Sequence, residues 1–419
     1  MVVDSGGVVT AAVVVREYDE KKDCKAVEKV ENICEVGGGP SSTGKLSLYT
    51  DLLGDPICRV RHSPTYLMLV AEMVVVVGGG VDKERREIVG MIRGCVKTVT
   101  CGTKFSTKPP DVVPVYDKVG YILGLRVSPS HRRMGIGLKL VRTMEQWFVK
   151  NDAQYSYIAT ENDNQASINL FTQKCNYSKF RTPSILVQPV FAHRIRPNNK
   201  INVIKLNPAD AESLYRRHFS TTEFFPHDID SVLNNKLNLG TFLAVPKGSY
   251  DAVSWPGAEK FLTGRPESWA VLSVWNCKDV MRLEVRGASR VRKVFAKTTR
   301  VVDRAFPWLN LPSVPEVFGP FGFHFLYGLG GEGPKQVKYI KALCGLAHNL
   351  GKEFGCGVVA TEVASCDPLK LGIPHWKSLS CAEDLWCMKK FGKIGSDECV
   401  GDWTKSPPGL SIFVDPREF

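Results

Sequence analysis

The chain has 419 residues, a hydrophobic fraction of 43%, a charged fraction of 23% and a formal net charge of +12. These fractions are typical of a globular protein with a sizeable core, so they exclude a disordered chain, and the length indicates two domains of ordinary size. No apolar run is long enough to span a bilayer, since residues 74–77 make only a strand, and a membrane partner is therefore not expected.

The positive net charge favours anionic partners. Most basic residues are dispersed and no cluster of stacking aromatic residues accompanies them, so direct binding of nucleic acid is not expected. The exception is residues 286–304, where basic and apolar residues recur at helical spacing. This segment predicts an amphipathic helix with a solvated basic face.

The thirteen cysteines are an odd number without a C-x-x-C pair, and the acidic, glycine-interrupted start of the chain does not predict a targeting peptide. The pattern predicts reduced, mostly buried thiols in an intracellular protein of the cytoplasm or the nucleus. The candidate metal ligands are Cys381, Cys387 and Cys399 with His375. Their spacing matches no common zinc pattern, so no metal site is expected.

The first part of the chain predicts a tail followed by strands and a helix. Residues 1–12 predict a mobile tail, and residues 13–18 and 19–36 predict a strand and a polar-faced helix. Two apolar runs at residues 66–77 and 87–99 predict an antiparallel pair of strands.

Residues 121–148 carry the most informative pattern. Residues 121–127 predict a buried strand, and Pro129 ends it because proline cannot donate to a strand ladder. The motif Arg132-x-x-Gly135-x-Gly137 then leads into an amphipathic helix. Glycines let an anion approach the backbone N–H groups of a helix start, and arginines add charge-assisted hydrogen bonds, so the motif predicts a phosphate site. The alternative is a helix start that needs small residues only for packing.

A second pattern follows. Residues 155–161 predict a strand, and Asn164 opens a helix that ends in Leu170 and Phe171. Together the two patterns resemble the coenzyme A loop and the next helix of the GNAT superfamily of N-acetyltransferases. The segments VREYDEKKDC and GKLSLYTDLLGDPICRVRHSP and the C-terminal half more closely resemble the plant Hookless-like N-acetyltransferases.

The resemblance implies a fold, a co-substrate and a biological role. The expected fold is α/β (α+β), with a mixed, mostly antiparallel sheet flanked by helices, and the expected co-substrate is acetyl-CoA. A Hookless-like protein is further expected to have a plant developmental role in differential cell growth. In this superfamily the region after the first helix borders the acceptor, so residues 44–64 are expected to lie near it.

The resemblance also implies binding residues. Backbone N–H groups of the coenzyme-binding strand would orient the acetyl carbonyl, the loop would hold the pyrophosphate, and the next helix start would lie by the pantetheine arm. These residues are Leu125, Arg126 and Val127 in the strand, Arg132, Arg133, Met134, Gly135, Ile136, Gly137 and Leu138 in the loop, and Asn164 by the pantetheine arm.

The acid and base residues of the superfamily match poorly. Many members carry a glutamate early on the coenzyme-binding strand, and Tyr121 stands there instead. Many use a tyrosine where this chain has Phe171, which cannot protonate a thiolate, and Tyr177 is the weak substitute. Tyr121 is therefore either a proton relay or a buried aromatic of the sheet.

The second half of the chain predicts a degenerate repeat of the first. A strand and helix at residues 202–219, middle strands at 270–275 and 280–285, and an Ala-Thr-Glu sequence shared by 159–161 and 360–362 support this interpretation. The expected organisation is tandem: a GNAT domain at 13–194, a linker at 195–200 and a degenerate GNAT-like domain at 201–419. The loop of the second half lacks both arginines and carries Glu332 and Pro334, so only the first half is expected to bind the coenzyme.

Two functions follow from these features. The first is an acetyl-CoA-dependent N-acetyltransferase that acts on a protein lysine or a small amine, with the acceptor itself unidentified. The second is a coenzyme-binding, catalytically weak regulator that acts through its second domain.

Overall fold

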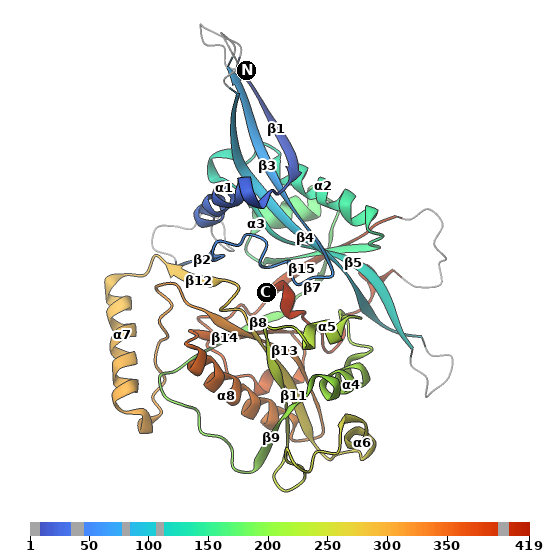
Figure 1. Cartoon of the computed structure of the whole chain (residues 1–419), viewed down its shortest axis with the longest axis vertical. Helices are drawn as coiled ribbons and strands as arrows, with labels where there is room; N and C mark the ends of the chain where they lie inside the picture. The colour runs from blue at the N-terminus through green and yellow to red at the C-terminus, as the bar shows by residue number, and fades with distance from the viewer. Residues whose placement is uncertain (1–8, 35–45, 78–83, 106–112, 393–401) are drawn as a thin grey trace.

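A computed structural model of the chain describes residues 9–34, 46–77, 84–105, 113–392 and 402–419. Two large mixed sheets dominate it, one in the upper and one in the lower half of the molecule, and the C-terminus lies between them (Figure 1). The expected class of mixed, mostly antiparallel sheets flanked by helices is confirmed.

The first sheet has seven strands. In spatial order they are β1 (Val9–Glu17), β3 (Thr65–Val77), β4 (Glu84–Phe105), β5 (Val113–Val127), β6 (Tyr155–Glu161), β15 (Asp384–Lys390) and β7 (Ser178–Arg181). Only β5 and β6 pair in parallel. Residues 9–12, predicted as the end of a mobile tail, instead begin β1, because residues 9–17 pair with β3.

The second sheet has six strands. In spatial order they are β9 (Ile201–Leu206), β10 (Asn238–Pro246), β11 (Trp269–Asn276), β13 (Phe323–Glu332), β14 (Val358–Val363) and β8 (Ser184–Pro189). Three antiparallel pairings are followed by one parallel and one antiparallel pairing, as in the first sheet from β1 onward. The predicted middle strand at 280–285 is wrong: β12 (Arg282–Arg286) pairs with β2 (Ser47–Asp51) in a separate ribbon, and β10 takes the middle place.

The two sheets exchange strands. β15 comes from the end of the chain but lies between β6 and β7 of the first sheet, and β8 precedes the predicted linker but lies at the edge of the second sheet beside β14. The division at residues 195–200 therefore separates neither sheet from the other half of the chain. The two-domain division stays a prediction, and the sequence analysis did not predict the exchange of strands.

Helices cover both sheets. They are α1 (Glu20–Ile33), α2 (Ile136–Lys150), α3 (Gln165–Asn169), α4 (Pro208–Phe219), α5 (Ile229–Leu233), α6 (Ala258–Thr263), α7 (Arg290–Ala305) and α8 (Gln336–Phe354), with a π-helical turn η2 (Leu170–Lys174) and five 3-10 turns, η1 (Pro129–His131), η3 (Pro307–Leu309), η4 (Pro368–Gly372), η5 (Trp403–Lys405) and η6 (Pro416–Glu418). None of the described helices is both long and apolar enough to cross a bilayer.

The helix α2 packs on the first sheet as its sequence predicts. Its buried side chains, Ile136, Leu140, Val141, Met144 and Phe148, recur at three- and four-residue spacing. Gly120 in β5 allows this close approach, since a Cβ there would lie 2.6 Å from the ring of Phe148. The helix start is thereby held at the end of β5.

The opposite face of the first sheet packs on the second half of the chain. One continuous hydrophobic cluster contains Tyr121 and Tyr157 of the first sheet together with Trp275 and Phe325 of the second. The C-terminal segment closes this junction, because the ring of Phe419 stacks on Phe325 with a centroid separation of 4.0 Å. The two halves thus share one core.

Candidate active site

The strand β5 bulges where the sequence predicts the acetyl group to lie. Met91 of β4 pairs with Arg126 and Arg93 with Leu123, so β5 has one residue more than β4 between these pairs. Gly124 lies within the bulge with φ +61°, and a Cβ there would lie 2.4 Å from Arg93 Nη1. Glycine is required both by this left-handed conformation and by the close approach.

Beyond the bulge β5 separates from β6. Their parallel pairing runs from Val119 and Tyr155 to Ile122 and Ile158 and then stops. The edge of β5 that faces β6 consequently has no strand partner over residues 123–127. The predicted carbonyl-binding residues Leu125, Arg126 and Val127 all belong to this stretch.

The loop after β5 presents an open backbone to solvent. Arg133 and Gly135 have φ of +63° and +78°, and Gly135 is the N-cap of α2 without a side-chain capping hydrogen bond. A Cβ on Gly135 would meet no atom within 4 Å. The first N–H groups of a helix lack intrahelical acceptors, so the start of α2 offers free donors and the positive end of a helix dipole.

Side chains of the loop divide between solvent and core. Arg132, Arg133 and Met134 are exposed, whereas Ile136 is buried and Leu138 packs against the cluster beneath α2. Arg133 and Arg132, which lies beside Cys34, are exposed where a ligand can approach, and Ile136 and Leu138 contribute only their backbone there. An anion can therefore approach the loop from the solvent side, and the residues present fit a pyrophosphate.

The corresponding loop of the second half is covered by its own chain. A Cβ on Gly333 would lie 2.0 Å from the carbonyl oxygen of Glu267, and the Lys335 N–H donates to Ser268 Oγ at 3.1 Å. Glu332 Oε1 lies 3.4 Å from His218 Nδ1. The second loop thus has neither the open backbone nor the arginines of the first.

Asn164 and Tyr177 have structural partners. Asn164 is the N-cap of α3, and its Oδ1 accepts from the Ser167 N–H at 3.2 Å. Tyr177 is buried beneath α2, where its hydroxyl lies 2.7 Å from Ser156 Oγ, and burial raises its pKa well above 10. Tyr177 lies in the cluster on one face of the sheet and Tyr121 in the cluster on the other.

Tyr121 lies in a stack of aromatic rings at the junction of the two halves. Its ring centroid is 4.6 Å from that of Tyr157, which in turn stacks on Trp386 of β15. Burial, reinforced by the charge of Glu418, raises the pKa of Tyr121 well above 10. The phenol is therefore neutral at physiological pH and is not an anionic base.

Three carboxyl groups that the sequence analysis missed lie around this stack. Glu362 Oε1 accepts from Trp386 Nε1 at 2.9 Å, and Glu418 Oε1 accepts from the hydroxyl of Tyr157 at 2.6 Å. Burial, together with the neighbouring charge of Asp384, raises the pKa of Glu362 well above 4.5. Burial also raises the pKa of Asp384 to about 7. Carboxyl groups whose pKa is raised beside a candidate site are typical of proton-transfer groups.

The sequence contains a partial signal for one of these carboxyl groups. Glu362 ends the second Ala-Thr-Glu sequence, which indicates a repeat but not that its glutamate reaches the other half. Asp384 reaches the site only because β15 joins the first sheet, and Glu418 because the C-terminal segment folds back between the sheets. No local pattern encodes either event.

On the α1 side of the bulge, arginines surround the buried carboxylate of Glu31. Arg93 Nη2 lies 3.2 Å from Glu31 Oε2, and Arg126 Nε lies 3.4 Å from Oε1. Burial raises the pKa of Glu31, but the charges of Arg93, Arg126 and Arg59 outweigh this and hold it below its usual range. Arg59 comes from the segment expected to border the acceptor. Three arginines therefore surround one carboxylate on this side of β5.

Comparison with known proteins identifies the family. Residues 58–177 match the model of the acetyltransferase (GNAT) family, a range that contains β5, the loop and α2. The chain is 68% identical to the "Probable N-acetyltransferase HLS1" of Arabidopsis thaliana over 97% of this chain and 100% of that protein. The chain belongs to the GNAT acetyltransferase family. The resemblance to Hookless-like proteins is confirmed by the same match.

Two further matches each cover more than nine tenths of the chain. The "Acetyl transferase GW6a" of Oryza sativa subsp. japonica is 38% identical, with 97% of each chain covered. A solved GCN5-related glucosamine N-acetyltransferase region of a fungal multi-domain GH3 β-N-acetylglucosaminidase superposes with a TM-score of 0.50 at 13% identity. That match covers 91% of this chain and 38% of the other and concerns the fold alone.

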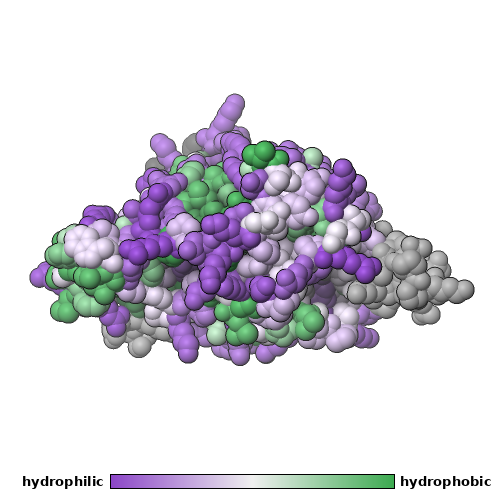
Figure 2. All heavy atoms as spheres, turned by 90° about the horizontal axis from the view of Figure 1, so that it is seen from below, coloured by the Kyte–Doolittle hydropathy of each residue, from purple (hydrophilic) through white to green (hydrophobic). Residues whose placement is uncertain are grey.

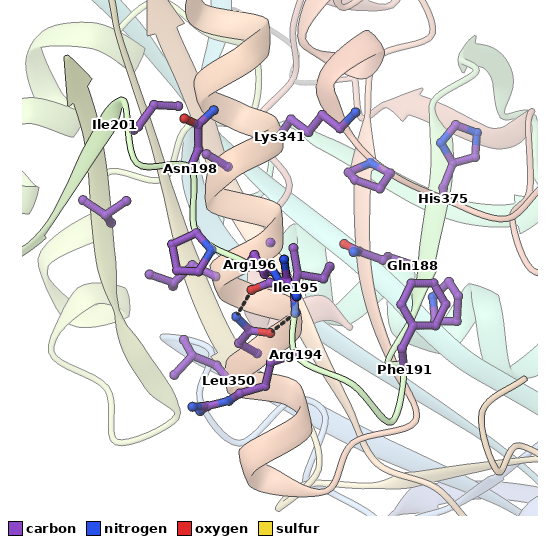
Figure 3. A pocket seen from close by; sticks show the side chains of 18 of the residues that line it. Gln188, Phe191, Arg194, Ile195, Arg196, Asn198, Ile201, Lys341, Leu350 and His375 are labelled. Atoms are coloured by element: carbon purple, nitrogen blue, oxygen red, sulfur yellow. Dashed lines mark hydrogen bonds between the residues drawn. The ribbon is translucent and has the colours of Figure 1, made fainter. Parts of the chain in front are cut away.

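A cavity of about 1060 Å³ lies beside α8, in the half of the molecule that contains the second sheet (Figure 3). It is bounded by α8 and by the segment from β8 to β9, which crosses α8. Figure 3 shows Arg194, Ile195 and Arg196 of that segment beside the helix, where the Ile195 N–H and carbonyl both bond Asn349 at 2.9 and 2.8 Å. The predicted linker is therefore tied to α8, and the cavity lies apart from the GNAT loop.

No group of three or more metal-ligating side chains lies together among the described residues. Cys381 and Cys387 are free thiols, and Cys399 lies outside the described part of the chain. His375 Nδ1 lies 2.9 Å from the carbonyl oxygen of Ile373.

Proposed function

We propose that this chain is an acetyl-CoA-dependent N-acetyltransferase that binds the coenzyme in its N-terminal half only. The observation that carries the proposal is the open backbone that runs from the bulge of β5, through the loop at Gly135, to the uncapped start of α2. Acetyl-CoA would supply a thioester whose carbonyl carbon an amine can attack. The following roles are those of the chain's own residues.

The loop would hold the pyrophosphate. Backbone N–H groups at Ile136, Gly137 and Leu138 meet the phosphate oxygens at the positive end of the α2 dipole, and Arg132 and Arg133 add charge-assisted hydrogen bonds. The open space above Gly135 leaves room for the phosphates.

The unpaired edge of β5 would orient the acetyl carbonyl. N–H groups between Leu125 and Val127 lack a strand partner on the side facing β6, so they are available to a carbonyl oxygen that becomes an oxyanion. Donors fixed by a sheet need no reorganisation during the reaction, which is why such groups contribute strongly to catalysis.

The attacking amine must lose a proton, because an alkyl ammonium has a pKa of about 10 in water. Burial raises the pKa of Asp384 to about 7, so Asp384 is the carboxyl best matched to accept a proton near neutrality. The pKa of the neighbouring Glu362 is also raised by burial. Tyr121, whose raised pKa keeps it neutral, would link the amine to these carboxyls through hydrogen bonds. Many GNAT members have a tyrosine at the position of Phe171 that protonates the departing coenzyme A thiolate, and phenylalanine cannot do this.

The biological setting remains part of the proposal. The acceptor is an amine of unidentified structure, on a protein lysine or a small molecule. Similarity to Hookless-like proteins supports a plant developmental role in differential cell growth. The free, mostly buried thiols of the described chain support a reducing location, in the cytoplasm or the nucleus.

The test combines binding and turnover. Calorimetry with acetyl-CoA should give one coenzyme per chain, since the second loop is covered and carries Glu332. Release of coenzyme A thiol in the presence of a panel of amines should then follow. Binding without release by any amine or lysine-containing peptide would favour the catalytically weak regulator instead, and absence of binding would refute both.

A further inference from the structure

The helix α7 is mounted on the molecule in an unusual way. It stands at the side of the molecule (Figure 1), and Ala296 and Asp303 are its only buried residues. An amphipathic helix normally buries its apolar stripe against the core. In α7 the side chains that face the body are the polar and small ones.

The face toward the body consists of Ala296, Thr299, Arg300 and Asp303, which recur at helical spacing and are buried or half-buried. Asp303 is fully buried and lies 2.7 Å from His193 Nδ1, while its other oxygen accepts from the Ala192 N–H at 2.8 Å. Thr299 Oγ1 accepts from the Val314 N–H at 3.2 Å. These specific polar contacts fix the orientation of the helix.

The apolar stripe therefore points away from the body. Its exposed members are Val291, Val294, Phe295, Val301 and Val302 in α7 and Phe306, Trp308, Leu309 and Leu311 just after it. Val291 is 78% exposed, and Val294, Phe295, Val301 and Trp308 are each 62% exposed. Figure 2 shows hydrophobic residues gathered at the end of the molecule where α7 lies in Figure 1. Contiguous exposed apolar surface of this kind marks interaction sites.

One flank of the stripe is basic. Arg290, Lys293, Lys297, Arg300 and Arg304 recur every three or four residues along it. Arg300 donates to the carbonyl of Val190 and Arg304 lies 3.3 Å from Glu316, but Arg290, Lys293 and Lys297 form no ion pair among the described residues. The sequence predicted this solvated basic face, and the structure adds that the apolar face is solvated as well.

We propose that α7 is a docking surface for an acidic amphipathic helix of another protein. A helix that lies along the stripe would bury its own apolar side there and place aspartates and glutamates opposite Arg290, Lys293 and Lys297. Helix-in-groove recognition uses this combination of apolar anchors and flanking charges.

Charge argues against two other occupants. A second copy of this chain in an antiparallel pair would place each basic flank against the same flank of its partner, where like charges repel. Adsorption to anionic lipid uses clusters of about four to eight free basic residues. The basic flank of α7 offers three, and the exposed Arg292 lies apart from that flank across the helix, so the free basic residues do not form one cluster.

The test uses two synthetic 18-residue peptides with the same leucine stripe, one flanked by glutamates and one by lysines. Fluorescence anisotropy with the full chain should detect the acidic peptide, weakened by salt, and at least about tenfold tighter than the basic one. Phe295→Ser should weaken acidic-peptide binding about tenfold or more, and Val253→Ser, at a loop position that is 96% exposed, should not. The double variant Lys293→Glu, Lys297→Glu should invert the preference.

Three outcomes would overturn the proposal. The peptides could bind equally well or not at all. Sedimentation could detect a dimer of the chain that Phe295→Ser abolishes. Vesicles of phosphatidylserine could bind the chain through α7 while vesicles of phosphatidylcholine do not. Because all substituted side chains are exposed, the variants are expected to fold, and thermal unfolding checks this.

Discussion

The hydroxyl of Tyr157 donates a 2.6 Å hydrogen bond to Glu418 Oε1 across 261 residues of chain. Tyr157 belongs to β6 of the first sheet, and Glu418 belongs to the turn that fills the junction with the second. Lys97 Nζ contacts the same oxygen of Glu418. One buried polar group thus links the proposed catalytic sheet to the end of the chain.

Removal of this hydroxyl should loosen the junction. Tyr157→Phe keeps the stacked ring but removes one of the two groups that meet Glu418 Oε1, and the loss of one hydrogen bond typically costs about 0.5–1.5 kcal/mol of unfolding free energy. Urea denaturation should detect this loss. Tyr66→Phe, at a position that is 40% exposed, should change stability by less than about 0.5 kcal/mol. Equal stability of both variants would show that the link contributes nothing.

Gly135→Asp should weaken acetyl-CoA binding about ten- to a hundredfold, because a carboxylate would stand where phosphate is expected. Calorimetry measures the effect. The matched control is Gly248→Asp, since Gly248 also has a left-handed φ, of +86°, and open space at its Cβ, but lies in an exposed turn after β10. Similar losses in both variants would assign the effect to backbone strain instead.

Tyr121→Phe should lower turnover by on the order of a hundredfold without loss of coenzyme affinity, because it removes only the proposed hydrogen-bonding link. Steady-state kinetics and calorimetry on the same preparation separate the two effects. Tyr177→Phe is the control, since its hydroxyl bonds Ser156 beneath α2. Full activity of Tyr121→Phe would show that the hydroxyl is not needed for catalysis and that Tyr121 only packs in the core.

Asp384 should make both activity and stability depend on pH. A base must be deprotonated, so turnover should rise with pH through about 7, and Asp384→Asn should remove that rise. The folded pKa lies above the unfolded value, so the protonated acid is favoured by folding. The stabilising effect of protonated Asp384 is present below about pH 4 and is lost as pH rises through about 7.

The stability part of this prediction has a clear sign. At pH 8 the buried Asp384 is ionised, and this ionisation destabilises the folded protein. Asp384→Asn should therefore unfold at a higher temperature than the wild type at pH 8, and its free energy of unfolding should be larger by on the order of 1–4 kcal/mol. At pH 4 the two proteins should match more closely. Calorimetric melts at both values check this, and a variant that is less stable at pH 8 would contradict it.

The exchange of strands predicts that neither half folds alone. A fragment of residues 1–194 would lack β15, which joins β6 to β7, and a fragment of residues 195–419 would lack β8, the partner of β14. Circular dichroism and amide exchange should detect little cooperative structure in either fragment, and co-expression should restore it. A cooperatively folded 1–194 fragment would establish the predicted division as a true domain boundary.

Much of the first half could be predicted because its signals are local. The strand at 155–161, the helix that begins at Ile136 and the glycine of the coenzyme loop depend on periodicity, on capping and on backbone freedom over a few residues, and the structure has each of them. The loop of the second half, which its own chain covers, also differs from the first loop in sequence, since it carries a glutamate and lacks the arginines.

The remaining features depend on contacts between distant segments, which no local pattern encodes. The sequence of β15 reads as an ordinary strand, and its place between β6 and β7 is decided by pairing with residues about two hundred positions earlier. The same holds for Asp384 and Glu418, whose pKa values rise only because folding buries them beside Tyr121 and Tyr157. In α7 the sequence determines an amphipathic helix, but burial of Asp303 against His193 decides that its apolar stripe faces solvent.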